Sequence, residues 1–189
     1  AIDKAGVRLN DVNNFLYARH APERNAQLKK INPNRNDNDR LSGMSDVDAA
    51  VVMSSFRKSG QLEKLESIAS MVDAITKESR RRIVASGLET AEVVQAWEDV
   101  YQRYVPLMAD MEVQIGKKKG GFTVKGEESQ RSLGQLEAAD NILANVVAQA
   151  QGTIMRSEKA KVGRSLLDLA RAHPCLLYTS PSPRDRQKS

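Results

Sequence analysis

The sequence predicts an all-α protein, built as an open array of long amphipathic helices. Over long stretches, apolar residues recur every three or four positions, which is the spacing of one face of a helix. The apolar residues are mainly Ala, Val, Leu, Ile and Met, and aromatic residues make up only 4% of the chain. A β-sandwich would use more aromatic and β-branched side chains. Because the chain has no run of about 18 apolar residues, we expect no membrane-spanning helix.

The first predicted helix covers residues 11–31. Within it, Glu23 follows Arg19 at i+4, which is a favourable pair on a helix surface. Pro22 lies inside this helix, and proline both removes a backbone hydrogen bond and clashes with the preceding turn. We therefore expect a kink or a break at Pro22. The Asn- and Asp-rich segment 32–43 is predicted to be a loop, since these side chains bond to their own backbone.

Three further helices follow, each with apolar residues at helical spacing: 45–59, 61–86 and 91–104. Ser45 and Asp48 have the spacing of a capping box at the start of the first of them. Gly87 suits the left-handed position after the end of the second. Thr90 can cap the third, whose apolar stripe includes Trp97, Tyr101 and Tyr104. We expect Trp97 to be the largest buried anchor of the protein.

Residues 106–132 differ from the rest because they are rich in glycine and lysine. We predict an exposed loop there, which could hold one short strand at 122–124. The helical period returns over 137–172 and predicts one long helix, with a bend near Gly152 or Gly163, where glycine weakens the helix by about 1 kcal/mol relative to alanine. The long helices 61–86 and 137–172 are expected to pack against each other or against other parts of a larger protein.

One stretch of the first helix is unusually polar, and its residues define the predicted polar cluster: Arg19, His20, Glu23, Arg24 and Asn25. One interpretation is a structural network of ion pairs and caps. The other is a catalytic site in which His20 carries a proton and pairs with Glu23, because histidine titrates near neutrality. General acid–base catalysis also needs a second partner and a cleft. We favour the structural interpretation and predict no catalytic residue.

Two basic clusters are candidates for phosphate contact: Lys77 with Arg80, Arg81 and Arg82, and Lys117 with Lys118 and Lys119. Neutralising a phosphate releases counterions and strengthens binding at low salt. The alternative is a solvated helix end and a solvated loop. The formal net charge of residues 1–174, +3, is well below that of strongly basic nucleic-acid-binding domains. The chain lacks phosphate-loop, zinc-protease, hydrolase and EF-hand motifs, so we predict no cofactor and no metal.

Residues 175–189, CLLYTSPSPRDRQKS, resemble the translation of a transposase-type sequencing adapter. We expect them to be an unstructured artefact that makes few contacts with the rest, and such segments are set aside before fold reasoning. They hold the only cysteine and a net charge of +2, from Arg184, Arg186 and Lys188 against Asp185. Without them, residues 1–174 carry a net charge of 5 − 2 = +3 and no cysteine. We expect 1–174 to be a helical fragment of a larger protein.

Several stretches together carry a family resemblance: FLYARHAPERN at 15–25, SGMSDVDA at 42–49, VYQRYVPL at 100–107, FTVKGEESQRSLG at 122–134, DNILANVVAQ at 140–149 and SEKAKVGRSLLDLA at 157–170. In combination they resemble a helix-rich region of the very large polyvalent proteins of tailed phages and conjugative elements. One departure is Met108-Ala109, where members of that family tend to have Arg-Gly.

The resemblance implies a parent protein with enzymatic domains elsewhere, carried in the virion or with transferred DNA and acting in the host cytoplasm. Our leading hypothesis is therefore a non-catalytic structural or interaction module whose partners are other regions of the parent chain. The alternative is a nucleic-acid-associated module that binds DNA through the clusters at 77–82 and 117–119. A third hypothesis is part of an enzyme centred on His20, Glu23 and Arg24. The sequence does not set an oligomeric state.

Overall fold

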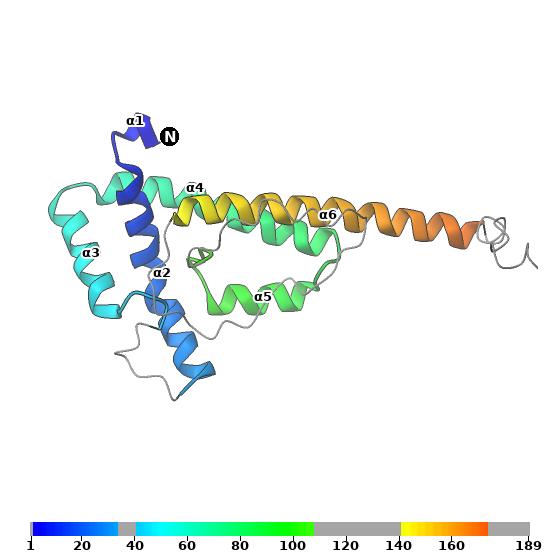
Figure 1. Cartoon of the computed structure of the whole chain (residues 1–189), viewed down its shortest axis with the longest axis horizontal. Coiled ribbons are helices and arrows are strands. Elements are labelled where there is room, and N and C mark those ends of the chain that lie inside the picture. Colours follow the sequence, from blue (N-terminus) through cyan, green and yellow to red (C-terminus); the bar gives the residue numbers. More distant parts are fainter. Residues whose placement is uncertain (1, 34–40, 108–140, 174–189) are drawn as a thin grey trace, which may run out of the picture.

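The computed structural model describes residues 2–33, 41–107 and 141–173. Over these ranges the chain is all-α, as predicted, and no strand occurs among the described residues. The helices are α1 (Ile2–Ala5), α2 (Leu9–Ile31), α3 (Asp46–Lys58), α4 (Leu62–Ala85), α5 (Ala91–Val100) and α6 (Ile142–Ala172). The long helices α4 and α6 lie side by side, α2 crosses them near one end, and α3 packs on α2 (Figure 1).

Helix α2 supplies most of the buried core. It contacts α3, α4 and α6, and every residue from Phe15 to Ala21 is buried. A helix that is covered on several sides has no polar stripe in its middle, because most of its surface faces protein. The side chains of Phe15 and Phe56 meet edge to face across the α2–α3 contact, with ring centroids 6.0 Å apart.

The predicted break at Pro22 is wrong, because α2 runs without interruption through this residue. The proline itself is exposed, whereas Ala18, Ala21 and Asn25 around it are buried. Tertiary packing before and after the proline therefore holds the helix together across the missing hydrogen bond. A change in the helix direction at Pro22 stays a prediction.

The helix ends around α3 and α4 follow the local signals in the sequence. The Ser45 hydroxyl accepts a hydrogen bond from the Asp48 backbone N–H, at 3.1 Å, and caps α3. After α4, Gly87 adopts a left-handed conformation with φ of +60°. Its N–H donates to the Val84 carbonyl at 2.8 Å, and the Leu88 N–H donates to the Ile83 carbonyl at 3.0 Å. These two bonds form a Schellman motif.

Helix α5 is shorter than predicted, since it ends at Val100 rather than at Tyr104. Tyr101 is extended, with φ of −129° and ψ of 100°, and the following segment brings its tyrosines against α2. The expectation for Trp97 is also wrong, because its side chain is only half-buried. Helix α5 contacts chiefly α4, so one neighbour cannot cover all of its apolar stripe. The largest fully buried side chains are those of Phe15, Leu16 and Leu28 instead.

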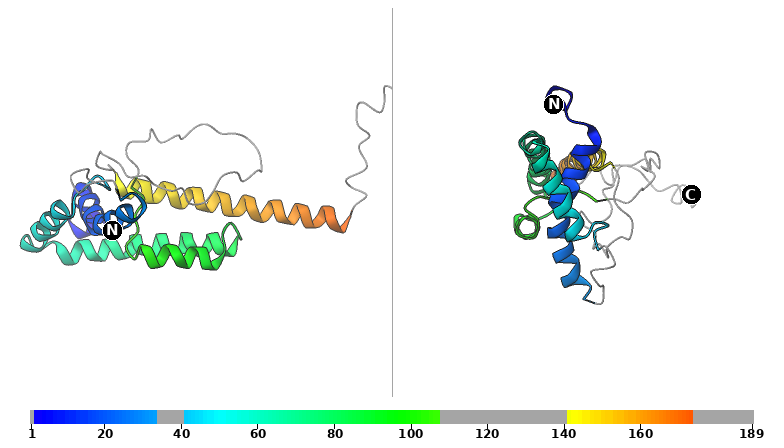
Figure 2. Two further views of the ribbon diagram at one scale, coloured as in Figure 1. Left: turned by 90° about the horizontal axis from the view of Figure 1, so that it is seen from below. Right: turned by 90° about the vertical axis from the view of Figure 1, so that its left-hand side faces the viewer.

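Helix α6 is described from Ile142 onward, and residues 137–140 of its predicted range lie outside the described part. It continues as one helix through both glycines, and a bend at either one stays a prediction. As expected, α6 packs against α4. Only the first half of α6 contains buried residues, the last being Ser157. Beyond it the helix projects past the end of α4 (Figure 2).

Most of the predicted loop 106–132, including its proposed strand, and all of 175–189 lie outside the described residues. Pro106 and Leu107 have no regular structure. In the part of the chain that the structure describes, no helix is both long and apolar enough to cross a membrane.

Candidate functional site

The residues of the predicted polar cluster on α2 lie in two different environments. Arg19 lies in the first, where α2 meets α4. Its side chain is only 3% exposed and donates to both carboxylate oxygens of Asp73 on α4, with one bond of 3.0 Å. A second carboxylate, that of Glu66, lies 3.9 Å from the guanidinium. The fork geometry of arginine matches a carboxylate with two parallel bonds. Arg19 thus fixes α2 against α4.

Asn25 anchors the segment that leads into α3. Its side-chain amide donates to the Met44 carbonyl at 2.9 Å and to the Asp46 carboxylate at 2.7 Å. Its side-chain oxygen accepts a bond of 2.9 Å from the Ser42 N–H. The hydroxyl of Tyr17 also donates to the Ser42 carbonyl, at 2.7 Å. These buried bonds substitute for water around an irregular segment of backbone.

His20 lies at the centre of the second environment, next to the segment that follows α5. It is 1% exposed and packs against Tyr101 and Tyr104, with ring centroids 5.4 and 5.7 Å away. Its Nδ1 atom lies 3.9 Å from the Glu23 carboxylate and has no hydrogen-bond partner. That carboxylate instead accepts a bond of 3.1 Å from the Arg103 backbone N–H. Glu23 therefore holds the segment after α5 more closely than it holds the imidazole.

Two arginines complete this environment. Arg24 donates to the Tyr101 hydroxyl at 2.8 Å and lies over its ring at 5.7 Å. Arg80 lies over the Tyr104 ring at 5.4 Å and pairs with Glu98 at 3.5 Å. A cation over an aromatic face is attracted to the ring quadrupole. We call this set the His20 cluster: His20, Glu23, Arg24, Arg80, Tyr101 and Tyr104.

The His20 cluster joins residues from both of the groups singled out in the sequence, since Arg80 comes from the basic group. The two tyrosines were missed, because they were assigned to an apolar helix stripe. The available signal was their hydroxyl groups, which usually find a partner when the ring is buried or half-buried. Here the Tyr104 hydroxyl accepts from the Gln149 side chain of α6 at 3.2 Å. Segments from α2, α4, α6 and 101–104 thus converge.

The surroundings of His20 keep its imidazole neutral. Burial, and then the nearby charges of Arg24 and Arg19, lower its pKa from 6.5 to about 3, while a hydrogen bond with the Arg103 backbone acts weakly in the other direction. Efficient general acid–base catalysis needs a pKa near the working pH. His20 is therefore poorly placed to exchange protons near pH 7, and its geometry suits a packing role.

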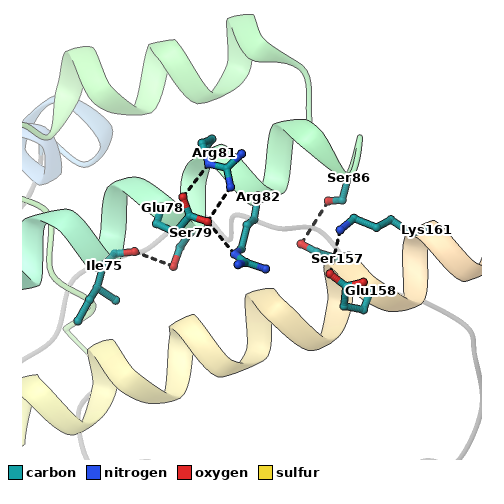
Figure 3. Close-up of polar contacts among 9 residues, drawn as sticks. All are labelled: Ile75, Glu78, Ser79, Arg81, Arg82, Ser86, Ser157, Glu158 and Lys161. Carbon is teal, nitrogen blue, oxygen red and sulfur yellow. Dashed lines mark hydrogen bonds and ion pairs between the residues drawn. The ribbon is translucent and has the colours of Figure 1, made fainter.

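The remaining basic residues of α4 have different surroundings. Glu78 accepts hydrogen bonds from Arg81 at 2.6 and 2.8 Å and from Arg82 at 2.9 Å (Figure 3). The bond from Arg81 is the main cause that lowers the pKa of Glu78 to about 2. Arg80 is turned toward Tyr104, whereas Lys77 is exposed. Lys117, Lys118 and Lys119 lie outside the described residues.

Near the end of α4, its contact with α6 includes a small polar pair. The buried Ser86 hydroxyl, at the end of α4, donates to the Ser157 hydroxyl at 3.2 Å (Figure 3). One turn further along α6, Lys161 donates to Glu158 at 2.9 Å. Arg164 then lies against the end of α4, with its guanidinium 2.9–3.1 Å from where a Cβ on Gly87 would be.

Several large apolar residues of α6 are exposed. Four of them lie on the same side of the helix. We call these four residues the open face of α6: Met155, Val162, Leu166 and Leu169. Between 41% and 60% of each is exposed. Isolated apolar residues on a surface are normal, but a contiguous row is typical of an interaction site.

Within the described ranges, no three metal-ligating side chains come together. No protein-family model, curated protein or solved structure shows a significant match to the chain.

Proposed function

We propose that this chain is a non-catalytic interaction module of a large phage-type polyvalent protein, carried in the virion or with transferred DNA. The sequence resemblance supports the family. The arrangement of the His20 cluster supports a structural role, because its polar groups bind one another and join four segments. The partner of the module is another region of the parent chain.

The observation that carries the proposal is the uneven use of α6. Its first half is bound to α4 through buried residues, whereas its second half contains none and carries three of the four residues of the open face. The backbone hydrogen bonds of a helix stabilise it only weakly in water. Most helical stability in proteins comes from packing of an apolar face. The second half of α6 therefore presents a surface that a partner can cover.

The genomic reading frame around this sequence tests the family assignment. We expect a long frame in which this module is flanked by further domains, some with enzymatic motifs. Each flanking region is then produced separately and its association with this chain is measured by size-exclusion chromatography. At least one region should bind, and Leu166→Asp should abolish that binding. A short frame, or flanking regions that all fail to bind, contradicts the proposal.

A nucleic-acid-associated module is the second candidate, because Lys77 and Arg81 are both exposed and lie one turn apart on α4. A salt series of DNA binding by fluorescence anisotropy separates the candidates, since phosphate contacts weaken steeply with salt. Binding at low ionic strength that is lost in a double variant with Lys77→Ala and Arg81→Ala favours the second candidate. Absence of binding at low ionic strength rejects it.

A further inference from the structure

We infer that residues 101–104 form an acid-sensitive strap. Protonation of His20 releases this strap from α2, together with α5, while the hydrophobic core stays folded. The strap begins directly after α5 and ends before Val105, which is fully buried. Three features carry the inference: the strap is held around His20, a charge on that side chain is disfavoured while the strap is in place, and the strap lies outside the core.

The contacts between the strap and α2 meet at His20. The rings of Tyr101 and Tyr104 pack against the imidazole, with centroids 5.4 and 5.7 Å away. Between them, the Arg103 backbone forms a hydrogen bond with the His20 side chain. The N–H of Arg103 also donates to Glu23 Oε2 at 3.1 Å. One imidazole therefore supports both rings of the strap and part of its backbone.

A second proton on His20 would compete with the strap for a carboxylate. In a protonated histidine both ring nitrogens are donors. Nδ1 of His20 is buried without a hydrogen-bond partner, and Glu23 Oε2 lies 3.9 Å from it. The same oxygen accepts the bond from the Arg103 N–H. If Glu23 moves to bind the new proton, it therefore loosens its hold on the strap.

The charged groups around His20 belong to three helices: Arg19, Glu23 and Arg24 on α2, Arg80 and Asp73 on α4, and Glu98 on α5. Asp73 pairs with Arg19, and Glu98 pairs with Arg80. The strap adds two neutral tyrosine rings and the exposed Arg103, and α6 adds the uncharged Gln149. Burial acts most strongly against the imidazolium, followed by the arginines, and together they lower the pKa of His20 to about 3. Glu23 would attract the charge but does not outweigh these effects.

The strap supplies part of this burial. With the strap in place, His20 is only 1% exposed. Once the strap leaves, water reaches the imidazole from that side, and the pKa of His20 returns toward its ordinary value of 6.5. The open form therefore binds a proton that the closed form refuses, and acid shifts the equilibrium toward the open form.

The strap and α5 lie outside the hydrophobic core, so they can open separately from it. Helix α5 is on the outside of the array, beside α4 (Figure 1). The structure describes all of residues 91–104, and none of them belongs to the core cluster. Val94 is the one buried residue among them. Val105, by contrast, is part of the core. Units with few buried apolar contacts open at a lower free energy than the core of a protein.

Amide hydrogen exchange of the full chain tests the release, with rates corrected for the intrinsic effect of pH. Because the pKa of His20 is about 3 in the closed form and 6.5 ordinarily, opening should increase by up to about 30-fold from pH 7.5 to pH 5. Amides of 94–104 should show this increase, and those of 15–21 should stay at least about tenfold better protected at both pH values. Amides of 159–172 are the internal control, since their opening does not uncover His20, and they should show no increase.

Two results of this experiment overturn the inference. If the amides of 94–104 are as well protected as those of 15–21 at both pH values, the strap leaves only when the whole chain unfolds. If acid does not accelerate exchange in 94–104, the release does not depend on a proton.

His20→Gln and Tyr101→Phe form a pair of variants that separates the proton from the other contacts of the strap. His20→Gln should remove the acid acceleration in 94–104, because the titrating group is gone. Tyr101→Phe loses the hydroxyl that accepts from Arg24 but keeps its ring. It should raise opening by a similar factor at both pH values and keep the acceleration. Acceleration that persists in His20→Gln, or is lost in Tyr101→Phe, overturns the role of His20.

A histidine titration of the parent chain gives the same test without a variant. The chain has two histidines, so NMR should show two imidazole C2–H resonances. The exposed His173 should titrate near its ordinary value, and at pH 6 it should be mostly protonated. His20 should still give the shift of a neutral ring at that pH. If His20 titrates together with His173 while the amides of 94–104 stay protected, the closed strap tolerates the charge and the inference is overturned.

Discussion

The imidazole of His20 and the backbone of Gly87 are the two places where single residues set strict conditions on this fold. His20 is buried between two tyrosines, with arginines nearby and one ring nitrogen that has no hydrogen-bond partner. A positive charge there would be desolvated and repelled by the guanidinium groups. The fold therefore accepts only the neutral form of this side chain.

The buried His20 predicts loss of stability in mild acid. Its pKa is about 3 in the folded state and 6.5 as the ordinary value. Below pH 6.5 the unfolded chain therefore takes up a proton that the folded chain refuses, and stability falls by up to about 1.4 kcal/mol per pH unit. Above pH 6.5 this contribution is fully present. Urea unfolding at several pH values between 6.5 and 5 measures the slope.

A pair of histidine variants controls this measurement. His20→Gln should flatten the dependence between pH 6.5 and 5, because the titrating group is gone. His173→Gln, at the exposed end of α6, should leave the slope unchanged. If His20→Gln keeps the full slope of the parent chain, a different group causes the acid sensitivity.

Replacing Gly87 with alanine should lower the free energy of unfolding for two reasons. Its φ of +60° is unfavourable for a residue with a side chain, and a Cβ would also lie 2.9 Å from an Arg164 nitrogen. Gly60 has a similar φ of +69° but open space around it. Gly60→Ala should therefore lower the free energy of unfolding by about 1–2 kcal/mol, and Gly87→Ala should lower it further, as measured by urea unfolding.

The contribution of the contact with Arg164 is tested by removing that side chain. A chain that already carries Arg164→Ala should tolerate Gly87→Ala about as well as the parent chain tolerates Gly60→Ala. An unchanged cost of Gly87→Ala in that background would show that Arg164 moves away freely.

At the scale of elements, α2 is held to its neighbours by side chains that are specific rather than merely apolar. Arg19 binds Asp73 of α4, and Asn25 binds the segment before α3. Tyr17 adds a further buried bond to that segment. Buried polar groups are costly unless they are satisfied, so these bonds select one position of α2 among those that apolar packing alone would allow.

The Arg19 contact predicts unequal effects for its two carboxylate partners. Asp73→Asn removes the charge that meets the buried guanidinium with two hydrogen bonds and should lower the free energy of unfolding by about 1.5–3 kcal/mol. Glu66→Gln is the matched control, because Glu66 lies 3.9 Å away and is about half exposed. It should change stability by less than about 1 kcal/mol. Thermal or urea unfolding measures both, and equal effects would contradict the assigned pairing.

At the scale of the whole molecule, the array has a tightly packed end and an open end (Figure 1). At the packed end, the core residues of α2 meet α3, α4 and the start of α6. The His20 cluster adds the segment that follows α5. At the other end, α6 has no buried residue beyond Ser157, although Arg164 still lies against Gly87. Local stability should therefore decrease along the long axis of the molecule, from the packed end to the open end.

Amide hydrogen exchange tests this gradient. Amides in the middle of α2 should exchange most slowly, since opening them requires disruption of the core. Amides from 143 to 157 of α6 should be protected to an intermediate degree, and those from 159 to 172 least. Uniform protection along all of α6 would mean that a second copy or another contact covers the open face in solution.

Sequence patterns predicted every helix of the described residues except the short α1, together with several helix ends. Apolar spacing, the Ser45 cap and the glycine at 87 are local signals that act within a few residues of the chain. They place α3 and α4 within one or two residues of their predicted ranges. The polar cluster was also visible, because five polar residues within seven positions are conspicuous without any tertiary knowledge.

Features that depend on residues far apart in the chain became visible only in the folded structure. The partner of Arg19 is 54 positions away, and Arg24 meets Tyr101 across 77 positions. Tyr101 is extended just after α5, where Arg24 binds it, and α2 continues through Pro22 with buried residues on both sides. The same applies to α6, since its buried residues lie on one side of the first half of the helix and the open face lies on the opposite side. Periodicity shows that a face is apolar, but the lengths and positions of neighbouring helices decide how much of it is buried.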